Sequence, residues 1–241
     1  MSARKTTVVV GVGPGLGMSI AHRFGREGHA VALISRSDRR HAGYVSALAE
    51  AGIEAESFVA DVRDRDQILS ALDAVTERFS RIDVLYYGPG AADLRTPPEP
   101  IVGMDAVSVR EAMASVYSAV DVVGKVLPGM IERGDGGLLF AGGLSALTPM
   151  PALGALALSS AALRNYALTL NTALVEKGVY AGSVIIGGLI ERGDIHKMVE
   201  SQRDRSGDVG IRSLDPDEIA DTAWKLYSQR DRPEATFNAF G

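Results

Sequence analysis

The 241-residue sequence has no cysteine, so it contains neither a disulfide framework nor a thiolate that could bind zinc. Its four histidines are His22, His29, His41 and His196, and their spacing is not typical of a metal site. We interpret all four as surface or structural residues. The sequence therefore predicts no metal cofactor.

The sequence also lacks any block of basic residues. It has 25 lysines and arginines against 30 aspartates and glutamates, which gives a formal net charge of -5 at pH 7. This balance argues against nucleic acid or an anionic membrane as the main partner, so we expect a small-molecule ligand. A hydrophobic share of 46% over this length suits one globular α/β domain, residues 1–241, with a sizeable core.

Two apolar stretches raise the question of targeting or membrane insertion. The run before Val10 is short for a signal peptide, and a glycine-rich turn and a charged helix follow it. Residues 136–163 carry no charge, but Pro149, Pro151 and several glycines divide them. A strand, a loop and a buried helix explain this stretch better than a membrane span, and we expect a cytoplasmic protein.

Residues 7–36 carry the clearest structural pattern in the chain. Residues 7–10 have the β-branched content of a buried parallel strand, and residues 31–34 form a second apolar run. Between them, Ile20 and Phe24 recur at helical spacing, and Gly28 ends that predicted helix. This pattern predicts a βαβ unit, whose glycine-rich turn is a site for phosphate.

The glycines of this turn follow the pattern Gly11-x-x-x-Gly15-x-Gly17. A G-x-G-x-x-G pattern fails, because its third glycine would fall on Leu16. Glycine permits the sharp turn and a close approach of backbone to a pyrophosphate, and the helix N-terminus offers free N–H groups. A turn that binds nothing is the alternative, but the flanking strands and helix favour nucleotide binding.

Strand and helix patterns alternate through the rest of the chain. Asp64 is predicted to cap one helix, and residues 215–218 open the last helix with an N-cap aspartate, a proline and a capping-box glutamate. The alternation of strands and helices predicts a single-domain, Rossmann-like fold, which is a doubly wound parallel sheet with helices on both faces. The remaining predicted helices are 39–51, 64–79, 105–133 and 153–176, and the remaining predicted strands are 54–59, 82–87, 138–141, 183–186 and 235–239.

Several motifs occur in an order typical of one family. After the glycine pattern come Asp61-Val62, Asp83-Val84-Leu85, Leu127-Pro128-x-Met130 and Lys177-Gly178-Val179. In this set the chain resembles the short-chain dehydrogenase/reductase superfamily over nearly its whole length. The resemblance implies a dinucleotide cofactor, with Asp61 and Val62 near the adenine.

Arg36 bears on the type of dinucleotide. An acidic residue after the second strand would bind a ribose 2′-hydroxyl, whereas Ser35, Arg36 and Ser37 suit a 2′-phosphate. A solvated arginine with Asp38 nearby is the alternative, and we favour NADP(H). The predicted cofactor-binding residues are Gly11, Pro14, Gly15, Leu16, Gly17, Ser35, Arg36, Asp61, Val62, Gly88, Pro89 and Gly187.

The catalytic half departs from the family. The resemblance implies a Tyr-x-x-x-Lys pair on the helix that starts near residue 153, but the aligned positions hold Leu156 and Ser160, and no such pair occurs in the sequence. The family's catalytic serine falls on Gly143 or Leu144, with Ser145 just beyond. The family's helix asparagine falls on Ser115, and Tyr87-Gly88-Pro89-Gly90 replaces the usual Asn-Asn-Ala-Gly.

These replacements remove the usual proton donor, because leucine cannot donate a proton. Ser145, Tyr87 and Tyr117 are candidate substitutes, and ordinary loop, core and interface roles are the alternatives. An apolar pocket that orients a small substrate fits the remaining residues. The predicted pocket residues are Leu144, Ser145, Leu156 and Ile190.

Three functions remain open at this stage. The favoured one is a non-redox enzyme of the isomerase, cyclase or dehydratase type that acts on a small apolar substrate. The alternatives are an NADP(H)-dependent oxidoreductase with a relocated proton donor and a non-catalytic dinucleotide-binding or sensor protein. The resemblance also implies a homo-oligomer, dimer or tetramer, in which the helices 105–133 and 153–176 pair across a two-fold axis.

Overall fold

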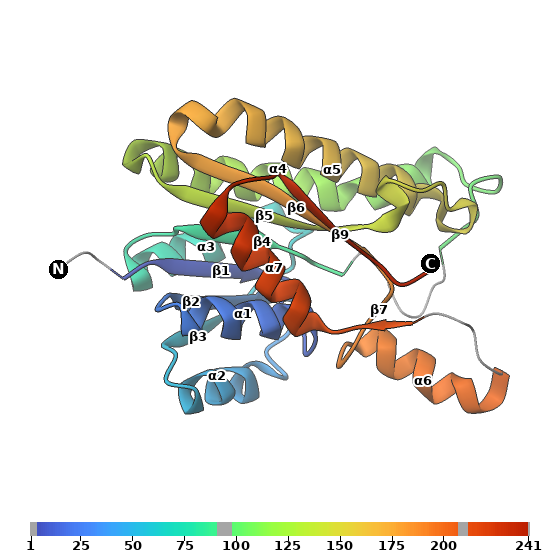
Figure 1. Ribbon diagram of the computed structural model, residues 1–241, viewed down its shortest axis with the longest axis horizontal. Helices are drawn as coiled ribbons and strands as arrows, with labels where there is room; N and C mark the ends of the chain where they lie inside the picture. The colour runs from blue at the N-terminus through green and yellow to red at the C-terminus, as the bar shows by residue number, and fades with distance from the viewer. Residues whose placement is uncertain (1–3, 91–97, 207–211, 241) are drawn as a thin grey trace.

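The computed structural model describes residues 4–90, 98–206 and 212–240 (Figure 1). Within these residues, seven strands form one parallel sheet, which confirms the predicted fold class. The strands are β1 (Thr6–Val10), β2 (Ala30–Ser35), β3 (Ala55–Val59), β4 (Val84–Tyr87), β5 (Gly136–Gly143), β6 (Val179–Gly187) and β9 (Glu234–Asn238). Their order across the sheet is β3-β2-β1-β4-β5-β6-β9.

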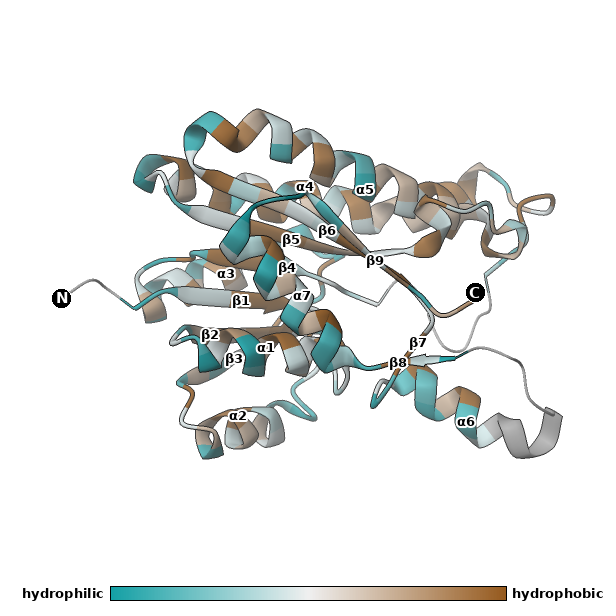
Figure 2. Ribbon diagram, in the orientation of Figure 1, coloured by the Kyte–Doolittle hydropathy of each residue, from teal (hydrophilic) through white to brown (hydrophobic). Residues whose placement is uncertain are grey.

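Helices cover both faces of the sheet. One face carries α1 (Leu16–Arg26), α2 (His41–Glu50) and α7 (Pro216–Gln229), and the other carries α3 (Arg65–Phe79), α4 (Ala106–Arg133) and α5 (Gly154–Leu174). Buried side chains form one hydrophobic cluster on each face. Figure 2 shows mainly hydrophobic residues along the central strands and hydrophilic ones on the outer turns of α1 and α7. This is the pattern that two-sided burial of a parallel sheet requires.

Side-chain caps fix the predicted helix starts. The Asp64 carboxylate accepts hydrogen bonds from the N–H groups of Asp66 and Gln67, and that of Asp215 accepts one from Asp217. Each cap satisfies backbone donors that lack a partner inside the helix. Helices therefore begin where the aspartate signals in the sequence predict.

Other boundaries differ from the sequence prediction. The predicted strands 138–141 and 183–186 are short versions of β5 and β6, and the predicted helix 39–51 ends earlier, at Glu50. The extra residues of β5 are all glycine, which has low strand propensity, whereas β6 begins four residues earlier than predicted, at Val179. In β5 glycine is needed, since a Cβ on Gly137 would collide with the Tyr227 ring and one on Gly136 would lie 2.6 Å from Met130 Cγ.

Two strands and one α-helix were not predicted at all. They are the strands β7 (Leu189–Ile190) and β8 (Ser213–Leu214), which pair in parallel, and the helix α6 (Asp194–Ser206). Two-residue strands carry no periodic signal, and α6 is strongly polar. Among the described helices, α4 alone has the length and hydropathy of a membrane span, but it packs against α3, α5 and β5.

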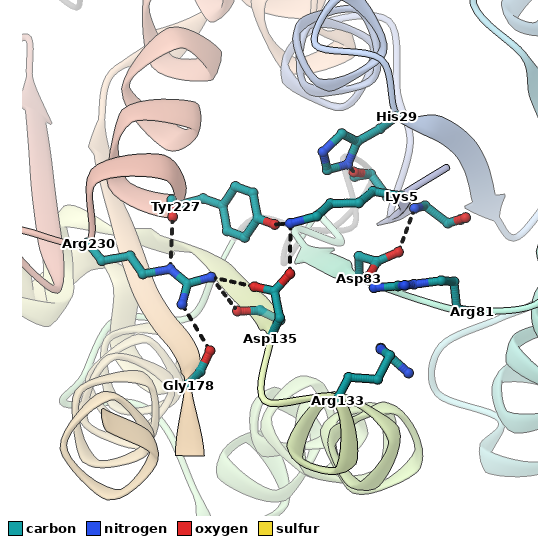
Figure 3. Close-up of polar contacts among 12 residues, drawn as sticks. Lys5, His29, Arg81, Asp83, Arg133, Asp135, Gly178, Tyr227 and Arg230 are labelled. Carbon is teal, nitrogen blue, oxygen red and sulfur yellow. Dashed lines mark hydrogen bonds and ion pairs between the residues drawn. The ribbon is translucent and has the colours of Figure 1, made fainter. Parts of the chain in front are cut away.

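A polar network ties together the amino ends of the central strands (Figure 3). The Lys5 ammonium donates to Asp135 Oδ2 at 2.7 Å and to the Tyr227 hydroxyl at 3.1 Å. Arg230 donates to Asp135 Oδ1 and to the Gly178 carbonyl, both at 2.9 Å. These contacts join the start of β1, the loop before β5 and the end of α7. The network lies at the end of the sheet opposite the glycine-rich turn.

His29 makes stability depend on pH. Its ring is 5% exposed, Nδ1 lies 2.8 Å from Thr7 Oγ1, and the ring meets the edges of Phe24 and Trp224. Burial, and secondarily the charge of Lys5, lower the pKa of His29 from 6.5 to about 4. The folded chain therefore binds fewer protons here than the unfolded chain, and stability falls as the pH drops from about 6.5 towards 4.

We expect the free energy of unfolding to fall by about 2–3 kcal/mol between pH 7.5 and 4.5 through His29 alone. Urea unfolding at both pH values measures the total change. His29→Asn keeps a polar partner for Thr7 and removes the part of the pH dependence that comes from the His29 ring. The carboxylates of this variant titrate as they do in the wild-type protein. An equal pH dependence in both proteins, or an NMR titration that gives a ring pKa near 6.5, would contradict the assignment.

Candidate functional site

Three loops converge at the carboxyl ends of the strands, on the side of the molecule where β7 and α6 lie (Figure 1). Gly11 has φ +89°, and a Cβ there would lie 2.5 Å from Pro89 Cα. Only glycine therefore allows the β1–α1 turn to meet the backbone after β4. A Cβ on Gly15 would lie 3.0 Å from the Glu191 carbonyl, so the segment after β7 covers the same turn.

The start of α1 is open to an anion. Gly15 is its N-cap, no side chain accepts a hydrogen bond from the helix N-terminus, and no acidic residue lies in the first turn. A Cβ on Gly13 would meet no atom within 4 Å, so space lies in front of the turn. An uncapped N-terminus with its positive helix dipole suits a pyrophosphate, and these residues fit a dinucleotide.

Two predicted nucleotide-binding residues at the end of β2 differ in whether their side chains are free to contact a ligand. The Ser35 hydroxyl is engaged, since it donates to the Ser37 carbonyl at 3.1 Å and lies 2.8 Å from His41 Nε2. Arg36 is exposed and makes no hydrogen bond or ion pair with any residue that the structure describes. Its guanidinium is therefore available to bind an anion at this end of the turn.

Asp61 lies close to Arg36 and is held by Arg63. Its Oδ1 accepts from Arg63 N at 3.0 Å and from Nε at 3.2 Å, and its Oδ2 accepts from Nη2 at 2.8 Å. The hydrogen bonds from Arg63, aided by the charge of Arg36, lower the pKa of Asp61. The adjacent Val62 is buried. The carboxylate that the resemblance places near the adenine is thus fixed in its charged form.

The segment from β7 to α6 is held over the glycine-rich turn by ion pairs. Arg40, at the N-cap of α2, binds Asp194 at the start of α6 through two hydrogen bonds of 2.8 and 3.0 Å. Arg192, with φ +66°, donates to Ser19 Oγ at 3.1 Å and pairs with Asp217 at 2.8 Å. No local sequence pattern identifies these contacts, because their partners are far apart in the chain.

The four predicted pocket residues come from three segments: Leu144 and Ser145 from the turn after β5, Leu156 from the start of α5, and Ile190 from β7. Leu144 Cδ2 lies 2.5 Å from the position of a Cβ on Gly187, and Ile190 packs on Gly15. Leu156 and Ser160 are four residues apart on α5 and so share one face of that helix.

Gly143, the last residue of β5, lies close to two hydroxyl groups. A Cβ placed there would lie 3.3 Å from Ser160 Oγ and 3.5 Å from Ser145 Oγ. Sequence reasoning identified Ser160 only as the residue at the lysine position. The structure brings its hydroxyl next to the end of β5, and no local pattern predicts that placement.

The two candidate tyrosines are placed differently. The Tyr87 hydroxyl donates to the Ser115 carbonyl of α4 at 2.6 Å, and burial raises its pKa. Tyr117, on α4, is 58% exposed. Of the three candidate proton donors, Ser145 alone lies beside Gly143.

Within the described ranges, no group of histidine, aspartate and glutamate side chains has the arrangement of a metal site. A groove lined by Phe58, Val59 and Ser70 runs between β3 and α3, away from Gly143. The candidate site is therefore the edge of the sheet between the glycine-rich turn and the start of α5.

Residues 5–203 match the sequence model of the short chain dehydrogenase family. A Streptomyces coelicolor protein named as a candidate ketoacyl reductase is 31% identical over 132 residues, which are 55% of this chain and 50% of that protein. The chain thus spans about half the length of this curated relative.

Two solved structures are similar over almost the whole chain. L-Sorbose reductase from Gluconobacter frateurii, complexed with NADPH and L-sorbose, has a TM-score of 0.84 at 22% identity, covering 98% of this chain and 96% of that one. A short chain oxidoreductase from Pseudomonas aeruginosa PAO1, described as containing an atypical catalytic center, has a TM-score of 0.84 at 21% identity, with the same coverage. At these identities the likeness shows the fold.

Proposed function

The chain belongs to the short-chain dehydrogenase family, and from this premise we propose that it is an NADP(H)-dependent oxidoreductase that interconverts a small carbonyl compound and an alcohol. The names of its relatives favour this function over the non-redox enzyme that the missing Tyr-x-x-x-Lys pair suggested. The redox residues of this protein are atypical, since Leu156 and Ser160 stand at the tyrosine and lysine positions. The reaction thus uses another proton donor.

The observation that carries the proposal is the open, uncapped phosphate turn at α1. The turn from Gly11 to Gly17 would hold the pyrophosphate, and Arg36 would hold the 2′-phosphate of NADP(H). When bound, NADPH supplies a hydride. The chain itself binds and orients the two reactants, with Ser145 as the hydroxyl beside the reacting groups.

A carbonyl panel tests the function. Purified protein is mixed with NADPH and ketones or aldehydes of increasing size, and both NADPH fluorescence and product are followed. Stoichiometric loss of NADPH and appearance of alcohol is the expected result. Substrate conversion with no change in NADPH would instead support an isomerase, cyclase or dehydratase, and NADPH binding without any turnover would support a sensor protein.

Arg36 should set the preference for the phosphorylated cofactor. We expect the wild-type protein to bind NADPH more tightly than NADH, and Arg36→Ala to weaken NADPH binding by about tenfold or more, because a charge-assisted hydrogen bond is lost. NADH binding should change little. Calorimetric titration measures both affinities, with Arg39→Ala as the control for a nearby exposed charge. Equal affinities for the two cofactors in the wild-type protein would contradict the preference.

We also propose that the protein is a cytoplasmic homo-oligomer, dimer or tetramer, that pairs through α4 and α5. Tyr117 and Val120 on α4 and Leu158 on α5 are large exposed apolar residues, which a helix–helix interface would cover. Val120→Glu should then dissociate the assembly without unfolding the subunit. Light scattering at micromolar concentration checks this, and a monomeric wild-type protein would contradict it.

A further inference from the structure

We propose that Ser213, His196 and Glu200 form a nucleophile, base and carboxylate triad that hydrolyses esters, an activity separate from the proposed redox function. The three residues come from β8 and α6, which lie beside β7 and outside the seven-stranded sheet (Figure 2). A serine hydroxyl that can pass its proton to a histidine attacks carbonyl carbon atoms. Because the Glu200 carboxylate repels anions, the substrate class is a neutral carboxylic ester.

The contacts of the His196 ring carry the proposal. Its Nε2 lies 2.9 Å from the Ser213 hydroxyl oxygen, and its Nδ1 lies 3.4 Å from Glu200 Oε2. A carboxylate beside Nδ1 favours the tautomer that carries its proton there, which leaves Nε2 free to accept the serine proton. His196 and Glu200 are one turn apart on α6, so the helix itself brings the base and the carboxylate together.

Two other histidines lie beside hydroxyl groups, and neither arrangement offers the same chemistry. His29 is 5% exposed, so a substrate has no access to it. The Ser35 hydroxyl beside His41 already donates to a backbone carbonyl. The Ser213 hydroxyl, by contrast, makes no other hydrogen bond to the described part of the chain, and Ser213 is half-buried rather than enclosed. The His196 side chain is 13% exposed, so a small ester can reach both groups.

The backbone of β8 supplies a donor for the oxygen that becomes negative during the attack. Leu189 N donates to the Arg212 carbonyl at 3.3 Å. Glu191 N donates to the Leu214 carbonyl at 3.0 Å, so the backbone groups of residues 212 and 214 face β7. The backbone groups of the residue between them face the other way, and in the described chain β8 pairs with β7 alone. The Ser213 N–H is therefore free to stabilise an oxyanion.

The reaction consumes only the ester and water. The Ser213 oxygen bonds to the carbonyl carbon of the ester while its proton passes to His196 Nε2. The bond between that carbon and the alcohol oxygen then breaks, and His196 returns the proton to the departing alcohol. Water attacks the acyl-serine with the same proton transfers and releases the carboxylic acid, which restores Ser213. Glu200 does not touch the ester and acts as a positioning residue for the ring.

The test uses para-nitrophenyl acetate and a fluorophosphonate probe, both without NADP(H). Released nitrophenolate measures hydrolysis, and peptide mapping by mass spectrometry identifies the residue that the probe modifies. The variants are Ser213→Ala, His196→Gln and Glu200→Gln. Ser201→Ala is the matched control, because Ser201 lies on the same helix and its hydroxyl already donates to a backbone carbonyl at 2.7 Å.

We expect the wild-type protein to hydrolyse the ester faster than buffer does and to carry the probe on Ser213. Ser213→Ala and His196→Gln should each lower the protein-dependent rate by about tenfold or more, since the nucleophile or its base is lost. Glu200→Gln should lower kcat by about two- to fivefold and leave KM unchanged, because only the orientation of the ring is affected. Ser201→Ala should match the wild-type protein.

Either of two results would overturn the triad. One is a wild-type protein in which Ser213 carries no probe, a measurement that needs no variant to fold. The other is a Ser213→Ala variant that hydrolyses the ester at the wild-type rate, which would mean that another group reacts with it. The hydrogen bond between Ser213 and His196 would then only tie β8 to α6, and its loss would lower the thermal midpoint alone. Carbonyl reduction with NADPH is measured separately, so its absence would refute the proposed function and leave the triad standing.

Discussion

Replacing Asp83 by alanine is expected to lower the free energy of unfolding by about 3–5 kcal/mol, a large fraction of the stability of a typical domain. Asp83 precedes β4 and is completely buried. Its Oδ2 accepts a hydrogen bond from the Thr6 N–H at 2.8 Å, and its Oδ1 forms an ion pair with Arg81 (Figure 3). Alanine would leave a buried N–H and a largely buried guanidinium without this partner, and unpaired buried groups are costly.

Urea unfolding of three variants separates the contributions. Asp83→Asn retains an oxygen acceptor for Thr6 but loses the charge opposite Arg81. Its free energy of unfolding should therefore lie between those of the wild-type protein and Asp83→Ala. Asp73→Ala breaks the exposed ion pair with Lys125 and should cost less than about 1 kcal/mol. If Asp83→Ala loses no more stability than Asp73→Ala, the buried aspartate is not the tie between β1 and β4 that the structure indicates.

Asp83 illustrates what the sequence alone could predict. The motif Asp83-Val84-Leu85 helped to identify the family, and alternating apolar runs with aspartate caps predicted the parallel sheet and most helices correctly. These signals are local: a cap and its first turn lie within four residues, and a buried strand is one apolar run. The contact between Asp83 and Thr6 joins residues far apart in the chain, so a motif could mark the residue without revealing what it does.

The elements that were not predicted depend on contacts between residues far apart in the chain. The strands β7 and β8 have two residues each, and they pair with one another across more than 20 residues of sequence. The polar helix α6 is linked to α2 through Arg40 and Asp194, which are 154 residues apart. Propensity and periodicity carry no information about such pairing, and tertiary contacts decide it.

The same distinction applies to the site. The spacing of Gly11, Gly15 and Gly17 predicted a sharp turn before a helix, and the structure has one there. On the catalytic side, an alignment could say which residues are missing but not which remaining groups come together. The predicted pocket residues Leu144, Ser145, Leu156 and Ile190 come from three separate segments, and the structure also brings the Ser160 hydroxyl close to Gly143. The non-redox interpretation relied on the missing residues and on an apolar pocket, and the names of the relatives fit the oxidoreductase alternative better.

Restoring the family pair should have the largest effect on activity. Leu156 and Ser160 share one helix face, and the Ser160 hydroxyl already reaches the end of β5. In Leu156→Tyr with Ser160→Lys, a phenol would stand beside the reacting oxygen, and a nearby ammonium would lower the phenol pKa. We expect NADPH-dependent ketone reduction to rise by about 10²–10⁴-fold over a slow wild-type rate, the usual contribution of a positioned general acid.

The matched control is Leu156→Phe with Ser160→Met, which adds similar bulk without a phenol or an ammonium. Steady-state rates and NADPH affinities of the wild-type protein and both double variants make the comparison, and Gly143→Ser can be added to the restored pair to supply the family serine.

A gain in the control equal to that in the restored pair would mean that pocket shape limits the reaction. A wild-type turnover already in the ordinary enzyme range, about 1–10³ per second, with no gain from the restored pair, would mean that the residues present already supply the proton efficiently. In that case the loss of the tyrosine and lysine would have no catalytic consequence in this protein.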